Sequence, residues 1–331
     1  MELASVILAA GEGTRMLSDL TKILHPLAGK PIARWVLDTA IDLGAGETVL
    51  VVGKDSAQIR QALDDDRIRY VYQAERRGTG HATMQARSVL EGRAALVLVS
   101  YGDMPLLEAE TLRLLVDNQR ATSAVMTILS LVHQDSRGFG RVIRDRAGHV
   151  LEVVEEKVCT PEQLAIKELN CGVYCFEGDW LWSHIDQIPL NPVKREYFLT
   201  DMIGIAVADG QTVDPISIDD PDQVIGINTR IHLAQAEAVI RRRTNKRLML
   251  AGVTLQDPAS TYVEPTVRVG NDTLLLAGTH LRGQTIVGSG CTIGPNAVIR
   301  DSTIGNRCRV RASLLEERLL PDDSEDRKSV V

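Results

Sequence analysis

Short apolar runs alternate with amphipathic stretches along the first two thirds of the chain. The apolar runs at 4–9, 47–52, 68–72 and 94–99 have the length of buried strands. The stretches at 31–43, 55–64, 80–91 and 108–119 have the apolar spacing of helices that keep one face in water. Strands that alternate with helices favour a mostly parallel sheet covered on both faces. We therefore predict an α/β, Rossmann-like domain over residues 1–228, followed by a connecting helix over 229–250.

The pattern changes near Val267. Aliphatic residues followed by glycine recur about every six positions, at Val269-Gly270, Val287-Gly288, Ile293-Gly294 and Ile304-Gly305. This period is typical of a parallel β-helix, and at about 18 residues per coil it predicts two to three coils within residues 251–315. Residues 316–331 are rich in charge, and we expect them to form a disordered tail.

The first apolar run leads directly into a glycine-rich segment, Gly11-Glu12-Gly13-Thr14-Arg15-Met16. Backbone N–H groups in such a turn can surround an anion, and Arg15 and Lys22 add positive charge. The segment does not match a P-loop and lacks the third glycine of the dinucleotide-binding fingerprint. It favours a nucleoside triphosphate as ligand. The alternative is a tight turn between a strand and a helix.

Asp103 follows the continuously apolar run at 94–99. Ligands of open α/β sheets collect beyond the carboxyl ends of the strands, so we expect Asp103 and the glycine-rich turn at the same edge. A carboxylate there suits Mg²⁺, which prefers oxygen ligands. The alternative is a helix N-cap, because Pro105 follows shortly after.

Composition excludes several classes of function. The formal net charge of −7 offers no basic domain for nucleic acid. The apolar runs are far shorter than the 18 or so residues of a membrane span, and Met1-Glu2 does not begin a secretory signal, so we expect a cytoplasmic protein. The five cysteines form no C-x-x-C pair, which indicates free thiols. Cys171 and Cys175 are expected to pack on one face of a strand.

Several motifs together resemble the sugar-1-phosphate nucleotidyltransferases. The first runs Leu8-Ala9-Ala10-Gly11-x-Gly13-Thr14-Arg15-Met16 and continues with Lys22-Ile23-Leu24-His25 and Gly29-Lys30-Pro31. The later ones are Gln73-Ala74-Glu75 with Gly78-Thr79-Gly80-His81-Ala82, Tyr101-Gly102-Asp103, Gly138-Phe139-Gly140-Arg141, Glu155, Asn170-Cys171-Gly172, Glu196-Tyr197-Phe198-Leu199-Thr200-Asp201 and Gly226-Ile227-Asn228-Thr229-Arg230. Within that superfamily the chain most resembles the N-acetylglucosamine-1-phosphate uridylyltransferases, the uridylyltransferase part of the bifunctional GlmU family. The resemblance covers residues 4 to about 315.

This resemblance implies a reaction and a set of site residues. The reaction is transfer of UMP from UTP to N-acetylglucosamine-1-phosphate, which gives UDP-N-acetylglucosamine, a cell-wall precursor, and pyrophosphate. Mg²⁺ would be the cofactor, held by Asp103 and Asn228, and Arg15 and Lys22 would be the catalytic cations. Nucleotide binding is expected at Leu8, Ala10, Gly11, Gly13, Gln73, Gly78 and Thr79. Sugar-phosphate binding is expected at Tyr101, Gly102, Gly140, Glu155, Asn170 and Asn228.

The resemblance also implies a left-handed β-helix and a homotrimer built through it. In bifunctional relatives a longer β-helix acetylates glucosamine-1-phosphate with residues beyond the point reached here, so no acetyltransferase activity is expected. Other readings remain open. One is a homologue that uses another base or sugar, another is a non-catalytic nucleotide-binding assembly subunit, and a third is a hexapeptide acyltransferase, which the short repeat disfavours.

Overall fold

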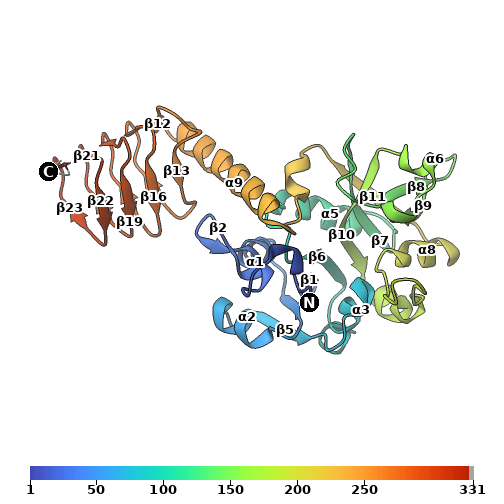
Figure 1. Cartoon of the computed structure of the whole chain (residues 1–331). Helices are drawn as coiled ribbons and strands as arrows, with labels where there is room; N and C mark the ends of the chain where they lie inside the picture. Colours follow the sequence, from blue (N-terminus) through green and yellow to red (C-terminus); the bar gives the residue numbers. More distant parts are fainter. Residues whose placement is uncertain (328–331) are drawn as a thin grey trace. The chain divides into compact units, whose positions relative to one another are not determined.

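The computed structural model describes residues 1–327, which form two compact units (Figure 1). Unit 1 comprises Met1–His25 and Pro31–His232, and unit 2 comprises Pro26–Lys30 and the chain from Leu233 onward. The sequence pattern did not separate Pro26–Lys30 from the first domain. These residues lie mostly in a short hairpin, β2 (Pro26–Leu27) and β3 (Lys30–Pro31).

A nine-stranded sheet forms the centre of unit 1. Its strands are β1 (Leu3–Leu8), β4 (Glu47–Val52), β5 (Ile68–Tyr72), β6 (Leu96–Tyr101), β7 (Met126–Val132), β8 (Arg141–Arg144), β9 (Val150–Val154), β10 (Glu168–Glu177) and β11 (Val213–Ile218). The main order is β11-β7-β10-β6-β1-β4-β5, with β8 pairing to β10 and β9 to β8. Within the main order only β10 runs antiparallel to its neighbours. The predicted α/β class with a mostly parallel sheet is confirmed.

Helices cover both faces of this sheet. They are α1 (Ile32–Asp42), α2 (Ser56–Leu63), α3 (Gly78–Met84), α4 (Arg87–Leu90), α5 (Ala109–Ala121), α6 (Pro161–Leu164), α7 (Gly178–His184) and α8 (Asp201–Ala208). Short 3₁₀ turns are η1 (Thr14–Met16), η2 (Lys22–Leu24), η3 (Glu156–Val158), η4 (Ile185–Gln187) and η5 (Pro221–Val224). The helix predicted at 80–91 is two helices, α3 and α4.

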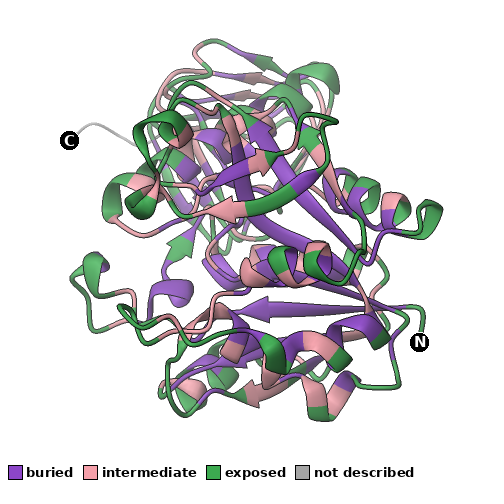
Figure 2. Cartoon of the chain, turned by 90° about the vertical axis from the view of Figure 1, so that its right-hand side faces the viewer, coloured by how far each residue is buried: buried purple, intermediate pink, exposed green. Residues whose placement is uncertain are grey.

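The strand β1 shows why its sequence is apolar at every position. Val6 and Leu8 belong to one hydrophobic core, which also contains Ala82 of α3. Ile7 belongs to another core, together with Ala33 of α1. Successive side chains of a strand point to opposite faces, so a sheet buried on both sides needs apolar residues throughout. Figure 2 shows the central strands as buried and the outer faces of surrounding helices as exposed.

Unit 2 contains most of a long helix, α9 (Arg230–Leu250), and three sheets of stacked parallel strands. The first sheet has β12 (Thr254–Leu255), β15 (Leu274–Leu275), β18 (Thr292–Ile293), β21 (Arg309–Arg311) and β24 (Glu325–Arg327). The second has β13 (Tyr262–Val263), β16 (His280–Arg282), β19 (Val298–Arg300) and β22 (Leu314–Glu316). The third has β14 (Arg268–Val269), β17 (Ile286–Val287), β20 (Thr303–Ile304) and β23 (Leu319–Leu320). This arrangement confirms the expected hexapeptide β-helix.

The β-helix is longer than the sequence pattern predicted. The strands of the described residues make four full coils and a further strand, rather than two to three coils. The spacing between stacked partners shortens along the chain, because His280 pairs with Val298, 18 residues on, whereas Val298 pairs with Leu314, only 16 residues on. This drift and the loss of glycine after Val310 obscured the later repeats.

The expectation of a disordered tail is wrong for residues 316–327, which complete β22 and form β23 and β24. Charged side chains of this segment form hydrogen bonds between stacked coils. Asp322 accepts a hydrogen bond from the backbone N–H of Asn306 at 2.8 Å, and Asp323 accepts one from Arg307 Nε at 2.7 Å, both across to the preceding coil. Residues 328–331 of the predicted tail lie outside the described residues.

Two further sequence predictions are tested by the fold. All five cysteines are free, and Cys171 and Cys175 are buried in the same hydrophobic core, as predicted. Among residues 1–327, no helix combines the length and apolar character needed to cross a membrane.

Candidate active site

The glycine-rich turn follows β1 and is fixed at both ends. The N–H of Ala9 donates to the carbonyl oxygen of Val51 at 2.9 Å, which keeps the Leu8–Ala10 segment beside β4. Gly11 has open space where a side chain would be. Gly13 has a φ of 65°, and its α-carbon packs against the side chain of Lys22. The turn therefore leaves backbone accessible at Gly11 and holds the lysine stem at Gly13.

Lys22, Asp103 and Asn228 meet beside this turn although they are far apart in sequence. Lys22 lies in η2 and is only 8% exposed. Its Nζ forms an ion pair with Oδ2 of Asp103 and donates to Oδ1 of Asn228 at 3.1 Å. The backbone N–H of Ile227 donates to the carbonyl oxygen of Asp103 at 2.8 Å, which fixes the Asn228 segment beside the end of β6.

The donor set of these residues suits a divalent metal. Asp103 supplies a carboxylate and Asn228 an amide oxygen, and both oxygens point to one cationic atom, Lys22 Nζ. Mg²⁺ commonly takes one or two oxygen ligands from protein and the rest from phosphate and water. Residues 1–327 contain no cluster of three or more His, Cys, Asp or Glu side chains that would form an all-protein metal cage. The residues therefore fit a metal ion that takes some of its ligands from the protein and others from a bound substrate.

The structure does not bring Arg15 into this cluster. Arg15 lies in η1 and is exposed, and within the described chain its guanidinium has no hydrogen-bond or ion-pair partner. A different arginine, Arg230, connects the segments instead. Its Nε donates to the carbonyl oxygen of Met16 at 3.2 Å, and its Nη1 lies 3.2 Å from Nδ1 of His25. Sequence reasoning gave Arg230 no role, although it stands in the same motif as Asn228.

Gln73, Gly78 and Thr79 are grouped at the start of α3. Gln73 is buried, and its Nε2 donates to the carbonyl oxygen of Gly78 at 3.2 Å and lies 3.0 Å from Nδ1 of His81. Burial and the charge of Arg77 lower the pKa of His81, so its neutral ring can accept this hydrogen bond. The Thr79 hydroxyl accepts from the backbone N–H of Leu199 at 3.0 Å.

Residues 196–199 close over the same group from another part of the chain. The backbone N–H of Tyr197 donates to the carbonyl oxygen of Arg77 at 2.7 Å, and that of Gly80 donates to the carbonyl oxygen of Tyr197 at 2.8 Å. Gly78 has a φ of 93°, and a Cβ there would lie 2.5 Å from the Tyr197 carbonyl oxygen. Glycine is therefore required at this approach of two backbones.

Tyr101, Gly140 and Asn170 are assembled around β10. Asn170 lies in β10 and donates two hydrogen bonds. Its backbone N–H donates to the Gly140 carbonyl oxygen at 2.9 Å, and its Nδ2 donates to the Tyr174 hydroxyl at 2.8 Å. The Tyr101 ring packs on Gly172, and burial raises the pKa of its hydroxyl. Gly102 follows Tyr101, and a Cβ on it would lie 3.1 Å from that of Ala9.

Glu155 stands at the end of β9 with a carboxylate neighbour. Glu155 is exposed, but the protein around its carboxylate and the charge of Asp201 raise its pKa, while Lys157 partly offsets this. Burial also raises the pKa of Asp201, the first residue of α8. A carboxylate whose ionisation is disfavoured by its surroundings and by a neighbouring like charge is a feature of functional sites. Asp201 was part of a recognised motif but was not among the predicted site residues.

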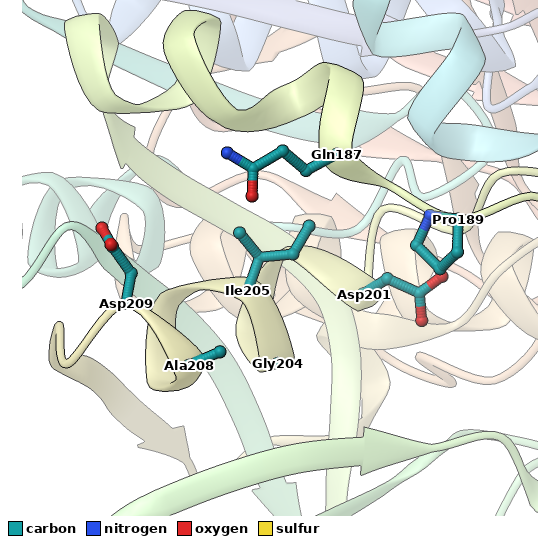
Figure 3. A pocket seen from close by; sticks show the side chains of 7 residues that line it. All are labelled: Gln187, Pro189, Asp201, Gly204, Ile205, Ala208 and Asp209. Carbon is teal, nitrogen blue, oxygen red and sulfur yellow. The ribbon is translucent and has the colours of Figure 1, made fainter.

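A separate cavity of about 440 Å³ lies beside α8. Figure 3 shows Asp201 close to Pro189, the Asp209 carboxylate just past the C-terminal end of α8, and the Gln187 side chain opposite Ile205. Gly204 and Ala208 complete its lining. Apart from Asp201, no residue of the recognised motifs lines this cavity, and none of the predicted site residues does. The cavity is therefore distinct from the group around Lys22.

Comparison with known proteins gives independent information. The family model described as a MobA-like NTP transferase domain matches residues 5–169, and the model of the bacterial transferase hexapeptide (six repeats) matches residues 266–301. A protein of Trichlorobacter lovleyi named "Bifunctional protein GlmU" is 44% identical over 97% of this chain and 70% of its own length. Proteins of the same name from an Exiguobacterium species and a Geobacillus species are 43% and 40% identical, each over 96% of this chain and over 70% and 69% of their own lengths.

Proposed function

Because the chain belongs to the GlmU family and is a sugar-phosphate nucleotidyltransferase, we propose that it transfers UMP from UTP to N-acetylglucosamine-1-phosphate and releases pyrophosphate. The observation that carries this proposal is the meeting of Lys22, Asp103 and Asn228 beside the glycine-rich turn. Cations and oxygen ligands next to accessible backbone are what a triphosphate requires.

The chemistry needs positioning and charge neutralisation more than proton transfer. The phosphate of a sugar phosphate is already an anionic nucleophile, so no general base is required. Lys22 and Arg15 would neutralise the phosphates as pyrophosphate departs, and the N–H groups of the glycine-rich turn would orient them. Divalent metals serve nucleotidyltransferases of this kind, and we propose Mg²⁺, which Asp103 and Asn228 would hold. When bound, it would offset the charge of the triphosphate.

The remaining predicted site residues fall into a nucleotide-binding group and a sugar-binding group. We propose that Gln73, Gly78 and Thr79, with Leu8, Ala10 and Gly11, bind the uridine part. The buried Gln73 amide has its Nε2 occupied by Gly78 and His81, so its Oε1 is the atom available to accept from uracil N3–H. Tyr101, Gly102, Gly140, Glu155 and Asn170 would bind the sugar, with the Glu155 carboxylate accepting from hydroxyl groups.

We further propose a homotrimer, since hexapeptide β-helices associate in this family. Light scattering at micromolar concentration tests it, and a monomeric mass would contradict it.

The test of the main proposal is pyrophosphate release from UTP with N-acetylglucosamine-1-phosphate and Mg²⁺. Asp103→Ala should abolish release. Asp66→Ala is the matched control, because Asp66 is exposed and precedes β5 at the opposite edge of the sheet. A panel of triphosphates and sugar phosphates then separates the alternatives. Faster release with another pair would indicate a homologue of different specificity, and UTP binding without release from any pair would indicate a silent subunit.

A further inference from the structure

The ammonium group of Lys22 occupies the point on which the two proposed metal ligands converge. Its Nζ contacts Oδ2 of Asp103 directly and lies 3.1 Å from Oδ1 of Asn228. The pair is shielded from water, since the side chains of Lys22 and Asp103 are 10% and 19% exposed. One cation therefore already satisfies the oxygens that a second cation would need.

A divalent ion and this ammonium group cannot share the two oxygens without strong repulsion. Mg²⁺ binds oxygen ligands at about 2.1 Å, so an ion on Asn228 Oδ1 would lie within about 5 Å of the present position of Nζ. Like charges at that separation repel strongly in a site with little water to screen them. Entry of the metal thus requires the lysine to give up at least one of its partners.

The structure limits how Lys22 can move and shows where its charge could go. The backbone of η2 is fixed because all three of its residues are buried, and Gly13 packs on the Cβ of Lys22. Only the outer methylenes and the ammonium group are left to swing. Because the lysine stem lies against the glycine-rich turn, phosphates bound at that turn would be within reach of Nζ.

We infer that Lys22 is an internal counter-cation, which releases Asp103 and Asn228 to a divalent metal only when nucleotide phosphates take over its ammonium group. The inference rests on the proposed function, because it assigns the metal to Asp103 and Asn228. The inference predicts an order of binding. The metal binds together with the nucleotide, and the nucleotide-free protein binds the metal weakly.

The experiment measures Mn²⁺ binding by electron paramagnetic resonance, with Mn²⁺ alone as the probe. Lys22→Met removes the ammonium and keeps an unbranched side chain. Without nucleotide it should bind Mn²⁺ at least about tenfold more tightly than the wild type, and Asp103→Asn in the same background should abolish this gain. Lys167→Met is the control for loss of one positive charge, since Lys167 is exposed and lies outside the cluster. Equal or weaker Mn²⁺ binding by Lys22→Met overturns the inference, as does a gain that survives Asp103→Asn.

Addition of α,β-imido-UTP supplies the second half of the test. The analogue should tighten Mn²⁺ binding to the wild type by a larger factor than to Lys22→Met, because only the wild type must release its ammonium first. An equal factor for both proteins contradicts the inference.

A further measurement avoids a substitution at the buried lysine. The reactivity of each lysine amine toward an acylating reagent is measured by mass spectrometry, with Lys167 as the internal reference. Asp103→Asn should raise labelling of Lys22 several-fold, and unchanged labelling counts against the ion pair. Tight Mn²⁺ binding by nucleotide-free wild type, together with normal pyrophosphate release, would overturn the inference and leave the proposed function standing. Tighter Mn²⁺ binding by Lys22→Met, without any pyrophosphate release from the wild type, would support the role of Lys22 as a counter-cation and contradict the proposed function.

Discussion

Gly13 and Lys22 are packed so closely that a Cβ on Gly13 would overlap the lysine side chain near its own backbone. The overlapping atoms are the first carbons of the lysine, which cannot swing away as its tip can. The φ of 65° at Gly13 adds backbone strain of about 1 kcal/mol or more for any other residue. The glycine therefore sets the position of the proposed catalytic lysine.

Gly13→Ala should lower kcat/KM for pyrophosphate release about 100-fold or more, because it displaces the Lys22 side chain and misplaces the ammonium group that would neutralise the phosphates. Gly92→Ala is a matched control, since Gly92 also has a φ of 65° but has nothing within 4 Å of its Cβ position. Steady-state kinetics with UTP and the sugar phosphate measure both variants. Similar losses in the two would show that backbone strain, and not the contact with Lys22, is responsible.

Arg230 is expected to act as a positioning residue. Its guanidinium joins the end of the turn at Met16 to His25, which directly follows the helix of Lys22. Arg230→Ala should lower kcat about 10- to 100-fold and change KM for UTP less than threefold, because the phosphate contacts remain but their alignment is lost. Arg230→Lys cannot make both contacts and should recover only part of the rate. Arg146→Ala, at an exposed arginine, is the control, and a rise in KM without loss of kcat would refute the positioning role.

Glu155 predicts a pH dependence with a definite direction. Burial and the Asp201 carboxylate raise its pKa, so it takes up a proton at a higher pH than an ordinary glutamate. As the solution is acidified, kcat/KM for the sugar phosphate should therefore begin to fall at a pH above 4.5, the ordinary pKa of a glutamate. Glu155→Gln should lower kcat/KM about tenfold, by loss of a charged hydrogen-bond acceptor, and remove this limb of the profile. An unchanged profile in Glu155→Gln would contradict the assignment.

The same shift has a consequence for stability. Because the folded protein holds this proton more tightly than the unfolded chain does, the ionised carboxylate destabilises the fold above its raised pKa. Glu155→Gln should raise Tm at pH 7, and the increase should shrink as the pH falls toward 4. Glu152→Gln, at an exposed glutamate with no such neighbour, should show no comparable increase.

Sequence patterns predicted the residues of the site that directly follow parallel strands of the sheet. The glycine-rich turn follows β1 and Asp103 follows β6, and these strands are parallel neighbours, so their carboxyl ends place both groups at one edge. Asn228 could not be derived in this way. It lies in the loop between η5 and α9 and does not directly follow a strand, and only the resemblance to a family indicated it.

The features that sequence analysis missed depend on partners distant in the chain. The contact of Arg230 with Met16 and the effect of Asp201 on Glu155 involve no periodic pattern. The charged residues after 315 indicated a disordered tail because a run of acids has no apolar surface to bury. In the structure Asp322 and Asp323 are held by Asn306 and Arg307 of the preceding coil, an arrangement that only the stacked fold provides.

Asn245 should stabilise the first coil of the β-helix. It lies on α9, is 1% exposed, and donates through Nδ2 to the carbonyl oxygens of Pro258 at 2.9 Å and Thr261 at 3.0 Å. These two carbonyls belong to the loop between β12 and β13, so one side chain satisfies the buried backbone of the first coil. Asn245→Leu keeps the approximate volume but leaves both acceptors without this donor, at a cost of about 1–3 kcal/mol each.

Asn245→Leu should therefore lower the local unfolding free energy of the first coil by about 2–6 kcal/mol. Hydrogen exchange followed by mass spectrometry, on peptides that cover residues 254–275, measures this directly, because exchange through local opening accelerates with the loss of free energy. Gln235→Leu makes the same type of change at an exposed position of α9 and should alter the free energy by less than about 0.5 kcal/mol. Exchange in Asn245→Leu as slow as in the wild type would mean that stacking between coils, rather than this side chain, holds the loop in place.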